Sequence, residues 1–357
     1  MRYIKYINVE SIYIEITNKC NFNCVYCYND SNYTKNEEIS FQVIKKIVEF
    51  CTQSGVKTLE ISGGEPLIHS YFNEILEYIY EKGLRVRLIS NGSLFSKHIE
   101  ILQRYNPMIQ TTLDGYTSEL NDFQRGDKSF NLIINGIKSL LESKYSGKLV
   151  SRCNLSKNNY LYISEYVDYL YNLGVRNIMF EVLNHMGRAM INNDIILKKN
   201  KETNQYFELQ KKLEELNELY PDMELIGIYD PISTCGYFDV YNQKKTDVSL
   251  RVDVYGNLYP CQFIDTKKYI LGNLYTTSVE EIISVNKFEE FINEVGNRKE
   301  IIEMCQYCVI SNYCNGGCPA RALMFNEDMN FSDGYCNLRK KVLLRSLMNK
   351  EKIVNVR

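Results

Sequence analysis

Three cysteines near the start of the chain, Cys20, Cys24 and Cys27, form a C-x3-C-x2-C pattern. They directly follow a predicted strand at residues 11–17, where isoleucines alternate with other side chains. Three thiolates can hold three irons of a [4Fe–4S] cluster and leave the fourth iron open to an amino and a carboxylate group. Zinc is the alternative, but it normally takes four ligands, and no fourth Cys or His is nearby. An open iron–sulfur site is therefore the preferred interpretation.

Seven more of the 12 cysteines lie beyond residue 230, and the chain has only three histidines. Cys235 comes first, Cys261 ends a G-x4-C pattern, four form C-x2-C-x5-C-x3-C from Cys305 to Cys318, and Cys336 comes last. A disulfide framework is not expected in a reducing cytoplasm, so soft thiolates favour iron–sulfur clusters or zinc. Zinc competes more strongly here, because four of these cysteines could close around one ion.

Predicted strands and amphipathic helices alternate through the first half of the chain. The strands are predicted at residues 11–17, 57–61, 85–89, 108–113, 149–155 and 176–182. The helices between them are predicted at residues 40–53, 71–82, 96–105, 129–142 and 160–173. Such repeats indicate a parallel sheet with right-handed crossovers. We therefore predict an α/β fold, a partial (β/α)6 TIM-like barrel, with the site at the C-terminal ends of its strands.

The pattern changes after the sixth predicted strand. We predict a barrel at residues 1–190, a bridging segment at 191–229 with a charged helix, and a cysteine-rich domain with a C-terminal helix at 230–357. Periodic apolar residues are sparse after residue 230, so metal clusters are expected to replace a large core there.

The composition is ordinary for a globular protein and excludes several classes of function. The 357 residues are 45% hydrophobic and 24% charged, with a formal net charge of −2. The absence of a basic block argues against a nucleic-acid partner. No apolar run is long enough to span a bilayer, and no signal peptide is recognisable, so a cytoplasmic protein is expected.

The first cysteine pattern, with Tyr26 before its third cysteine, resembles the signature loop of the radical S-adenosylmethionine (SAM) superfamily. S-G-G-E-P at 62–66, S-N-G at 90–92 and T-T-L-D-G at 111–115 resemble later motifs of that family. Glycines there permit a close backbone approach to the SAM amino group. The resemblance implies reductive cleavage of SAM to a 5′-deoxyadenosyl radical. It assigns SAM contacts to Tyr26, Ser62, Gly63, Gly64, Glu65, Asn91, Thr112, Arg152 and Leu183.

The later cysteines resemble the SPASM domain, which implies two auxiliary [4Fe–4S] clusters and three clusters in total. The resemblance assigns the outer auxiliary cluster to Cys305, Cys308, Cys314 and Cys336. It assigns the inner one to Cys235, Cys261 and Cys318. The family often has a further cysteine before these three, but this chain has none, which leaves an open iron or an oxygen ligand such as Asp230. An open iron could bind a substrate thiolate.

The resemblance implies that a ribosomally made precursor peptide, or a protein, is modified, for example by a thioether or carbon–carbon crosslink. A formylglycine-forming sulfatase maturase is the alternative, but that branch usually has Asp after the G-x4-C cysteine, where this chain has Gln262. The catalytic acid or base therefore stays unassigned among Asp230, Gln262 and Asp265. A non-catalytic iron–sulfur or zinc protein is a third reading, which the Gly63-Gly64-Glu65 motif disfavours.

Two protein partners are expected besides the substrate. A flavodoxin or ferredoxin is expected to supply electrons. About ten residues precede the first predicted strand, too few for a leader-peptide-binding domain. Either a separate leader-binding protein or the barrel itself would then hold the leader. Cys51 and Cys153, outside the cysteine groups, are predicted to be core residues.

Overall fold

The computed structural model describes residues 2–183, 185–197, 202–227 and 235–349. Its centre is a single sheet with the strand order β10-β9-β8-β1-β2-β3-β4-β5-β6-β7. The six predicted strands are present and parallel, as expected for a partial barrel. They are β1 (Ile7–Thr17), β2 (Thr58–Gly63), β3 (Arg85–Ser90), β4 (Met108–Thr112), β5 (Leu149–Leu155) and β6 (Asn177–Val182).

The sheet continues past both ends of the predicted barrel. Strand β7 (Glu224–Ile226) pairs in parallel with β6. On the other side, β8 (Thr246–Val252) pairs in parallel with β1 along its whole length. The antiparallel strands β9 (Asn257–Tyr259) and β10 (Gly272–Asn273) follow. Segments on the two sides of residue 230 therefore share one sheet through β1.

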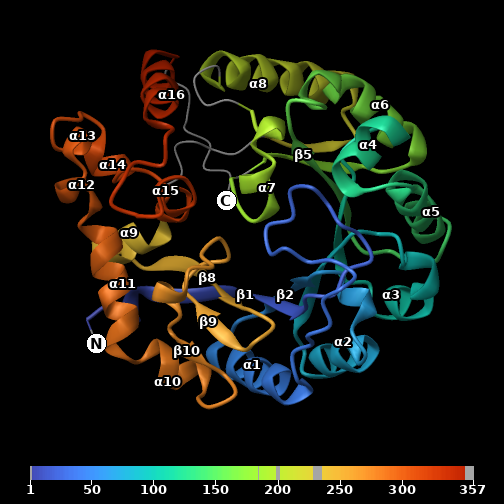
Figure 1. Cartoon of the computed structure of the whole chain (residues 1–357), viewed down its shortest axis with the longest axis horizontal. Coiled ribbons are helices and arrows are strands. Elements are labelled where there is room, and N and C mark those ends of the chain that lie inside the picture. Colours follow the sequence, from blue (N-terminus) through green and yellow to red (C-terminus); the bar gives the residue numbers. More distant parts are fainter. Residues whose placement is uncertain (1, 184, 198–201, 228–234, 350–357) are drawn as a thin grey trace.

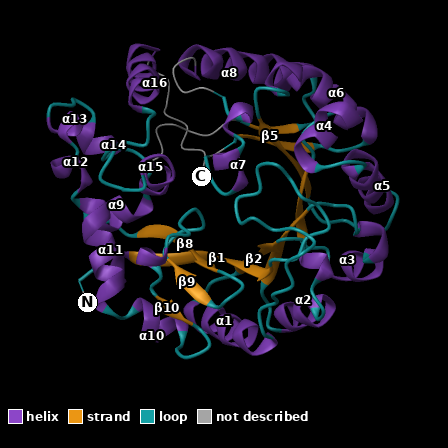
Figure 2. Ribbon diagram, viewed as in Figure 1, coloured by secondary structure: helices purple, strands orange, loops and turns teal. Residues whose placement is uncertain are grey.

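Helices cover the outer face of the barrel strands, and Figures 1 and 2 show them as an arc around the sheet. They are α1 (Phe41–Ser54), α2 (Phe72–Glu81), α3 (Ile99–Tyr105), α4 (Ser118–Arg125), α5 (Ser129–Leu141) and α6 (Ile163–Leu173). Helix α1 begins where the Ser40 hydroxyl accepts from the Val43 amide, and it ends at Gly55 with a left-handed backbone. Helix α4 was not predicted, because it is short and mostly polar.

Short helical turns join several of these elements. One of them replaces the start of the predicted helix at 96–105, which is divided between a 3-10 turn and α3. The 3-10 turns are Ile4–Tyr6, Pro66–Ile68, Phe95–Lys97, Tyr160–Tyr162, Asn193–Ile195 and Lys267–Tyr269.

The two faces of β1 have different surroundings. Ile12, Ile14 and Ile16 are fully buried in the layer between sheet and helices. The alternate residue Glu15 faces the other side and is also buried, where it forms an ion pair with Arg251 of β8 at 2.9 Å. This pair fixes the register of the two strands where the chain returns to the barrel.

The C-terminal region packs beside β8 and has an apolar core of its own. Phe288, Phe291 and Val295 on one helix pack with Tyr237, and this cluster is continuous with the barrel core. The expectation that metal clusters would replace a core was therefore wrong. The helices are α9 (Gly236–Tyr241), α10 (Val279–Ile283), α11 (Asn286–Gly296), α12 (Arg298–Ile301), α13 (Glu303–Gln306), α14 (Ser311–Cys314), α15 (Pro319–Asn326) and α16 (Cys336–Asn349).

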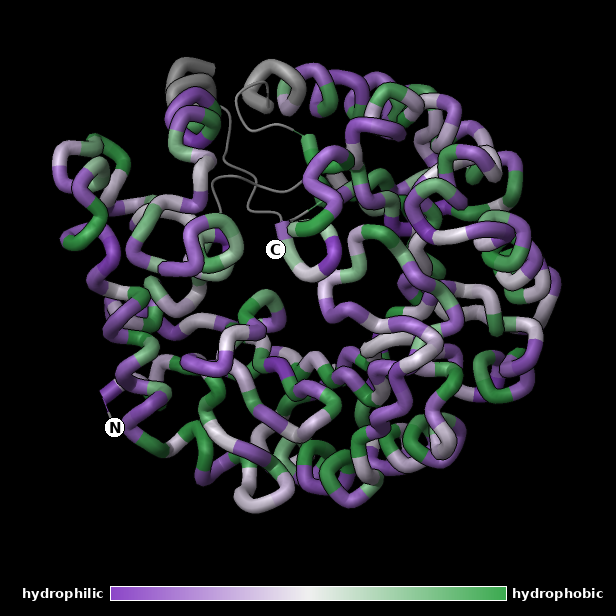
Figure 3. Tube along the Cα trace, viewed as in Figure 1, coloured by the Kyte–Doolittle hydropathy of each residue, from purple (hydrophilic) through white to green (hydrophobic). Residues whose placement is uncertain are grey.

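Two helices lie between the barrel and these C-terminal elements. Helix α7 (Arg188–Ile191) follows β6, and α8 (Glu202–Leu219) covers the predicted charged helix and contacts both α6 and α16. Within the described ranges, no helix combines the length and apolarity needed to cross a bilayer. Hydrophilic residues recur along the helices in Figure 3.

Replacement of Glu15 by Gln should destabilise the fold. Glu15→Gln leaves the buried Arg251 guanidinium without its charge partner, a loss that typically costs about 3–5 kcal/mol. Urea denaturation measures the change in the free energy of unfolding. Lys211→Met removes an exposed ion pair with Glu215 and is the matched control, with almost no change expected. Equal effects of the two substitutions would contradict the role given to Glu15.

Candidate iron–sulfur and SAM site

The N-terminal cysteine group, Cys20, Cys24 and Cys27, lies on the loop between β1 and α1. The Phe22 amide and the Asn91 side-chain amide donate to the Cys20 sulfur at 3.4 and 3.8 Å. Burial, Glu65 and the neighbouring thiols raise the pKa of Cys20 to about 12, and burial and the Cys24 thiol raise that of Cys27 to about 11. The three thiols therefore share one site, and they must release protons when a metal binds.

Two glycines let the end of β2 approach the start of the cysteine loop. A Cβ on Gly63 would lie 2.2 Å from the Thr17 carbonyl oxygen, and one on Gly64 would lie 2.2 Å from that of Lys19. The Gly64 amide donates to the Thr17 carbonyl at 2.6 Å, and the Glu65 amide to the Lys19 carbonyl at 2.9 Å. The absence of side chains thus lets two backbones make contact, and the contact of both glycines with SAM stays a prediction.

The carboxylate of Glu65 joins the ends of β2 and β3. It is 0% exposed and accepts hydrogen bonds from the amides of Asn91 (2.7 Å) and Leu67 (3.1 Å) and from the Ser90 hydroxyl (2.8 Å). Burial raises its pKa to about 7, against the hydrogen bonds, which lower it. Glu65 therefore holds the loop that carries Asn91, and a direct contact with SAM stays a prediction.

Tyr26 ties the cysteine loop to the ends of β4 and β5. Its hydroxyl donates to Asp114 and accepts from Arg125 at 2.7 Å and from the Asn154 side chain at 3.1 Å. Asp114 and Arg125 are both buried and lie 3.5 Å apart. Burial raises the pKa of Tyr26 well above its usual value, so this phenol stays protonated. Contact of Tyr26 with adenine stays a prediction.

The segment after β6 contacts the same loop from the other side. The Arg188 guanidinium donates to the Cys24 carbonyl at 2.8 Å and pairs with Asp30 at 2.9 Å. A Cβ on Gly187 would lie 2.3 Å from the Cys27 carbonyl oxygen, so a larger residue would displace the loop. The position of the N-terminal cysteine group therefore depends on residues more than 150 positions away in the sequence.

His185 links this segment to the C-terminal region. Its ring stacks on Phe325 of α15 at 5.5 Å and lies 3.2 Å from the Met324 carbonyl oxygen. Its other ring nitrogen lies 2.6 Å from the Asn193 side chain. These contacts make His185 a packing residue between the barrel and α15.

The remaining residues assigned to SAM lie on the same edge of the barrel. Ser62 accepts a hydrogen bond from a β1 tyrosine, Thr112 ends β4 beside Arg152 of β5, and Leu183 follows β6 and is buried. Arg152 forms an ion pair with Glu181 at 2.6 Å. The structure therefore gathers the residues assigned to SAM at the C-terminal ends of the strands, as expected, and their contacts with SAM stay predictions.

The inner cysteine group, Cys235, Cys261 and Cys318, comes together at the junction of β9, α9 and α15. Burial and the charge of Cys318 together raise the pKa of Cys235 and of Cys261 to about 12. Cys235 and Cys318 each precede the first turn of a helix, α9 and α15. The grouping is the one that the sequence predicted.

The outer cysteine group, Cys305, Cys308, Cys314 and Cys336, gathers four thiols at α13, α14 and the start of α16. Burial and the charges of the other three thiols together raise the pKa of Cys305 to about 11. Cys51 and Cys153 are buried in the apolar core, as predicted.

The candidate catalytic residues are less well placed by the structure. Asp230 lies outside the described residues. Gln262 is half-buried directly after Cys261, and Asp265 is exposed. Arg125, Arg188 and Arg251 hold the cysteine loops through hydrogen bonds and ion pairs. The sequence did not predict this role, because nothing in the local sequence distinguishes these arginines from others. Asp114 had a signal, since it is the acidic residue of the T-T-L-D-G stretch.

The donors at these sites fit iron–sulfur clusters. The three groups contain thiols and no histidine. Among the described residues, no three His, Cys, Asp or Glu side chains converge as they would on a single metal ion. Gln124, fully buried at the end of α4, has neither of its carboxamide atoms hydrogen-bonded within the described chain. The backbone carbonyl of Gln124 accepts from the Val25 amide at 2.9 Å, which places this residue beside the cysteine loop.

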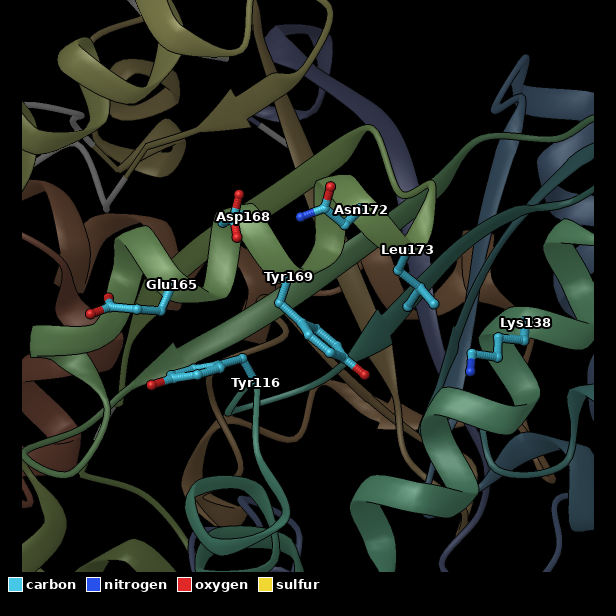
Figure 4. Close-up of a pocket in the computed structure, with 7 residues that line it drawn as sticks. All are labelled: Tyr116, Lys138, Glu165, Asp168, Tyr169, Asn172 and Leu173. Carbon is cyan, nitrogen blue, oxygen red and sulfur yellow. The ribbon is translucent and has the colours of Figure 1, made fainter.

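A separate open groove of about 550 Å³ lies on the outer helix layer. Figure 4 shows Lys138 of α5 facing Tyr169 of α6, with Tyr116 on a loop beside them. This groove is on the helices, away from the cysteine loops, and it contains none of the residues assigned above.

Comparison with known families agrees with this architecture. Residues 14–182 match the model of the Radical SAM superfamily, and residues 245–309 match an iron-sulfur cluster-binding domain, SPASM. The chain therefore belongs to the radical SAM superfamily of enzymes and carries a SPASM region, which implies SAM and iron–sulfur clusters as cofactors.

Individual relatives are distant but cover most of the chain. The subtilosin biosynthesis protein AlbA of Bacillus subtilis, which contributes to an antilisterial bacteriocin, is 26% identical over 88% of this chain and 68% of its own. Native anSMEcpe with bound AdoMet has a TM-score of 0.74 at 18% identity and covers 95% of this chain and 97% of its own. Streptococcus suis SuiB bound to precursor peptide SuiA has a TM-score of 0.72 at 16% identity. The match covers 92% of this chain and 76% of the SuiB chain.

Gly64→Ala should prevent assembly of the N-terminal cluster. The added methyl group would lie 2.2 Å from the Lys19 carbonyl oxygen, so the backbone before Cys20 must move. We expect a loss of about four irons per chain, measured after anaerobic reconstitution. Gly227→Ala adds a methyl group whose nearest neighbours lie 3.7 Å away, at a backbone that is not left-handed, and should retain the iron. Full iron content in Gly64→Ala would contradict the close-approach argument.

Glu65 should make stability depend on pH. Its pKa is raised from 4.5 to about 7, so its contribution is complete below about pH 4.5 and is lost as pH rises through about 7. Between about pH 4.5 and pH 7, the free energy of unfolding of the wild type should fall by up to about 3 kcal/mol relative to that of Glu65→Gln. Urea denaturation of both proteins across the range measures this difference. A difference that does not change with pH would show that the carboxyl group does not titrate there.

Proposed function

We propose that this chain is a radical SAM enzyme that modifies a ribosomally made precursor peptide, for example through a thioether or carbon–carbon crosslink. The observation that carries the proposal is the gathering of the cysteines into three groups, with the N-terminal group at the C-terminal edge of the barrel and the inner group beside β9 of the same sheet. Bound cluster and SAM together supply a 5′-deoxyadenosyl radical there. The relatives associated with bacteriocin biosynthesis and with a precursor peptide support the choice of substrate.

We further propose a role for each cysteine group. Cys20, Cys24 and Cys27 hold the SAM-binding cluster, and the inner and outer groups hold two auxiliary clusters, giving three in total. A crosslink removes two hydrogens from a peptide, one of them as a hydrogen atom. The other leaves as a proton and an electron, so an electron acceptor is needed near the site. The β1–β8 pairing brings the inner group to the same sheet and supports this role.

The chain's own residues position these groups. Glu65 and Asn91 hold the β3 loop against Cys20, while Asp114 and Arg125 hold Tyr26. Domain roles follow the predicted division, with the radical step assigned to residues 1–190 and the auxiliary clusters to 230–357. We propose a flavodoxin or ferredoxin as reductant, and a separate leader-binding protein where the barrel does not bind the leader.

The test separates SAM cleavage from peptide modification. Reduced, reconstituted protein should release 5′-deoxyadenosine from SAM. Cys27→Ala should lower the rate of this release at least 100-fold, because the cluster loses a ligand. Cys318→Ala should retain SAM cleavage but lose the crosslinked peptide, measured by mass spectrometry on a peptide encoded beside the gene. Cys51→Ala, a core cysteine outside all three groups, is the control and should retain both activities.

Two outcomes would contradict the proposal in different ways. Formylglycine on a sulfatase peptide, with no crosslink on the precursor, would make the protein a sulfatase maturase. Zinc without iron, and no SAM cleavage, would leave a non-catalytic metal-binding protein.

A further inference from the structure

Arg298 is a fully buried cation in the middle of the C-terminal region. It is the first residue of α12 and is 0% exposed. Its guanidinium donates hydrogen bonds to five backbone carbonyl oxygens, and no side chain accepts from it among the residues described. The acceptors are Met329 (2.7 Å), Asn315 (3.1 Å), Gly316 (3.2 Å), Gly317 (2.5 Å) and Phe331 (2.9 Å).

The charge of Arg298 has no carboxylate of its own in the described part of the chain. The acidic group that acts on it is Asp333, and Asp333 is already bound to Arg339 and lies 3.9 Å from Arg321. Two other buried arginines near cysteine loops, Arg125 and Arg251, have Asp114 and Glu15 as their partners. Carbonyl dipoles satisfy the N–H groups of Arg298, but a buried cation also needs a compensating negative charge.

Besides Asp333, the ionisable groups that act on Arg298 are cysteines from both auxiliary groups. Burial lowers the pKa of Arg298, and the charges of Cys235 and Cys318 of the inner group and of Cys305 of the outer group oppose this. The same guanidinium lowers the pKa of Cys235 and of Cys305. Arg298 therefore lies where it acts on both thiol groups.

Arg298 also fixes the turn between the two groups. Three of its carbonyl acceptors are the consecutive residues 315–317, and Cys314 of the outer group and Cys318 of the inner group flank that turn. Gly316 and Gly317 have positive φ angles of 75° and 80°, so the turn needs glycine and exposes its carbonyls to one cation.

We propose that Arg298 is a shared counter-charge that raises the reduction potentials of both auxiliary clusters. This role rests on the proposed function, because it requires clusters at the inner and outer groups. A fixed positive charge stabilises the reduced form of each cluster, which carries one more negative charge than the oxidised form. It makes both auxiliary sites better electron acceptors without itself gaining or losing a proton.

The test is a redox titration of the reconstituted full-length protein followed by electron paramagnetic resonance. Arg298→Gln should make reduction of both auxiliary clusters at least tenfold less favourable, which is about 59 mV for a one-electron couple. Arg298→Lys keeps the charge and should shift either potential by less than a third of that. The cluster at the N-terminal cysteine group is an internal control and should not shift.

Asn315→Gly distinguishes charge from support of the turn. It removes two side-chain hydrogen bonds, to the Val295 carbonyl (2.7 Å) and from the Lys299 amide (2.9 Å), and it suits the left-handed backbone at residue 315. Its auxiliary potentials should match the wild type. The inference is overturned if Asn315→Gly and Arg298→Gln shift the potentials alike, if Arg298→Lys shifts them as far as Arg298→Gln, or if Arg298→Gln shifts nothing.

Iron content separates failure of this inference from failure of the proposed function. About four irons per chain in the wild-type protein would mean that it holds one cluster and no auxiliary clusters. The proposed function and the role of Arg298 would then both fail. Arg298→Gln could lose both auxiliary clusters and keep only the N-terminal one. In that case, auxiliary clusters with wild-type potentials in Arg298→Lys would show that the auxiliary sites need a positive charge at residue 298. Loss of the auxiliary clusters in Arg298→Lys and Asn315→Gly as well would make Arg298 only a brace for the turn.

Discussion

Pairing of β1 with strands on both of its edges is the constraint on which the site depends. One edge joins β2 and the rest of the barrel, and the other joins β8, which comes back more than 230 residues later in the chain. The buried pair of Glu15 and Arg251 fixes this second edge. Arg251 also donates to the Ile264 carbonyl at 2.8 Å, and Tyr28, next to Cys27, donates to Glu15 at 3.0 Å. The loops of two cysteine groups are thus joined through one ion pair.

The motif residues that were assigned to the cofactor also hold the cysteine loop in place. Gly64 permits two backbones to touch, Glu65 bonds the next loop, and Asp114 holds Tyr26. The loop between β1 and α1 that carries the three thiols has no helix or strand of its own, and burial raises the pKa of all three thiols. Contacts from β2, β4 and the segment after β6 replace the missing secondary structure.

The sequence predicted the parts of the fold that repeat and missed those that depend on distant contacts. The alternation of Ile12, Ile14 and Ile16 identifies β1, and the same signal finds the other five barrel strands. Strand β8 has a similar local pattern, but nothing in it reveals pairing with β1. The grouping of the later cysteines followed from family spacing. The arginines at 188 and 298 carry no local signal, because their partners are mostly backbone carbonyls that any sequence provides.

A common electrostatic requirement explains why these arginines are buried. Each cysteine group becomes anionic when thiolates form, and burial of an anion is unfavourable unless a cation is near. Arg125 lowers the pKa of Cys24, Arg251 lowers that of Cys261, and Arg298 acts on the inner and outer groups. Two of these cations have an acidic partner, Asp114 or Glu15, which offsets part of their charge. Arg298 has none among the described residues, so its full charge is available to the thiol groups on either side.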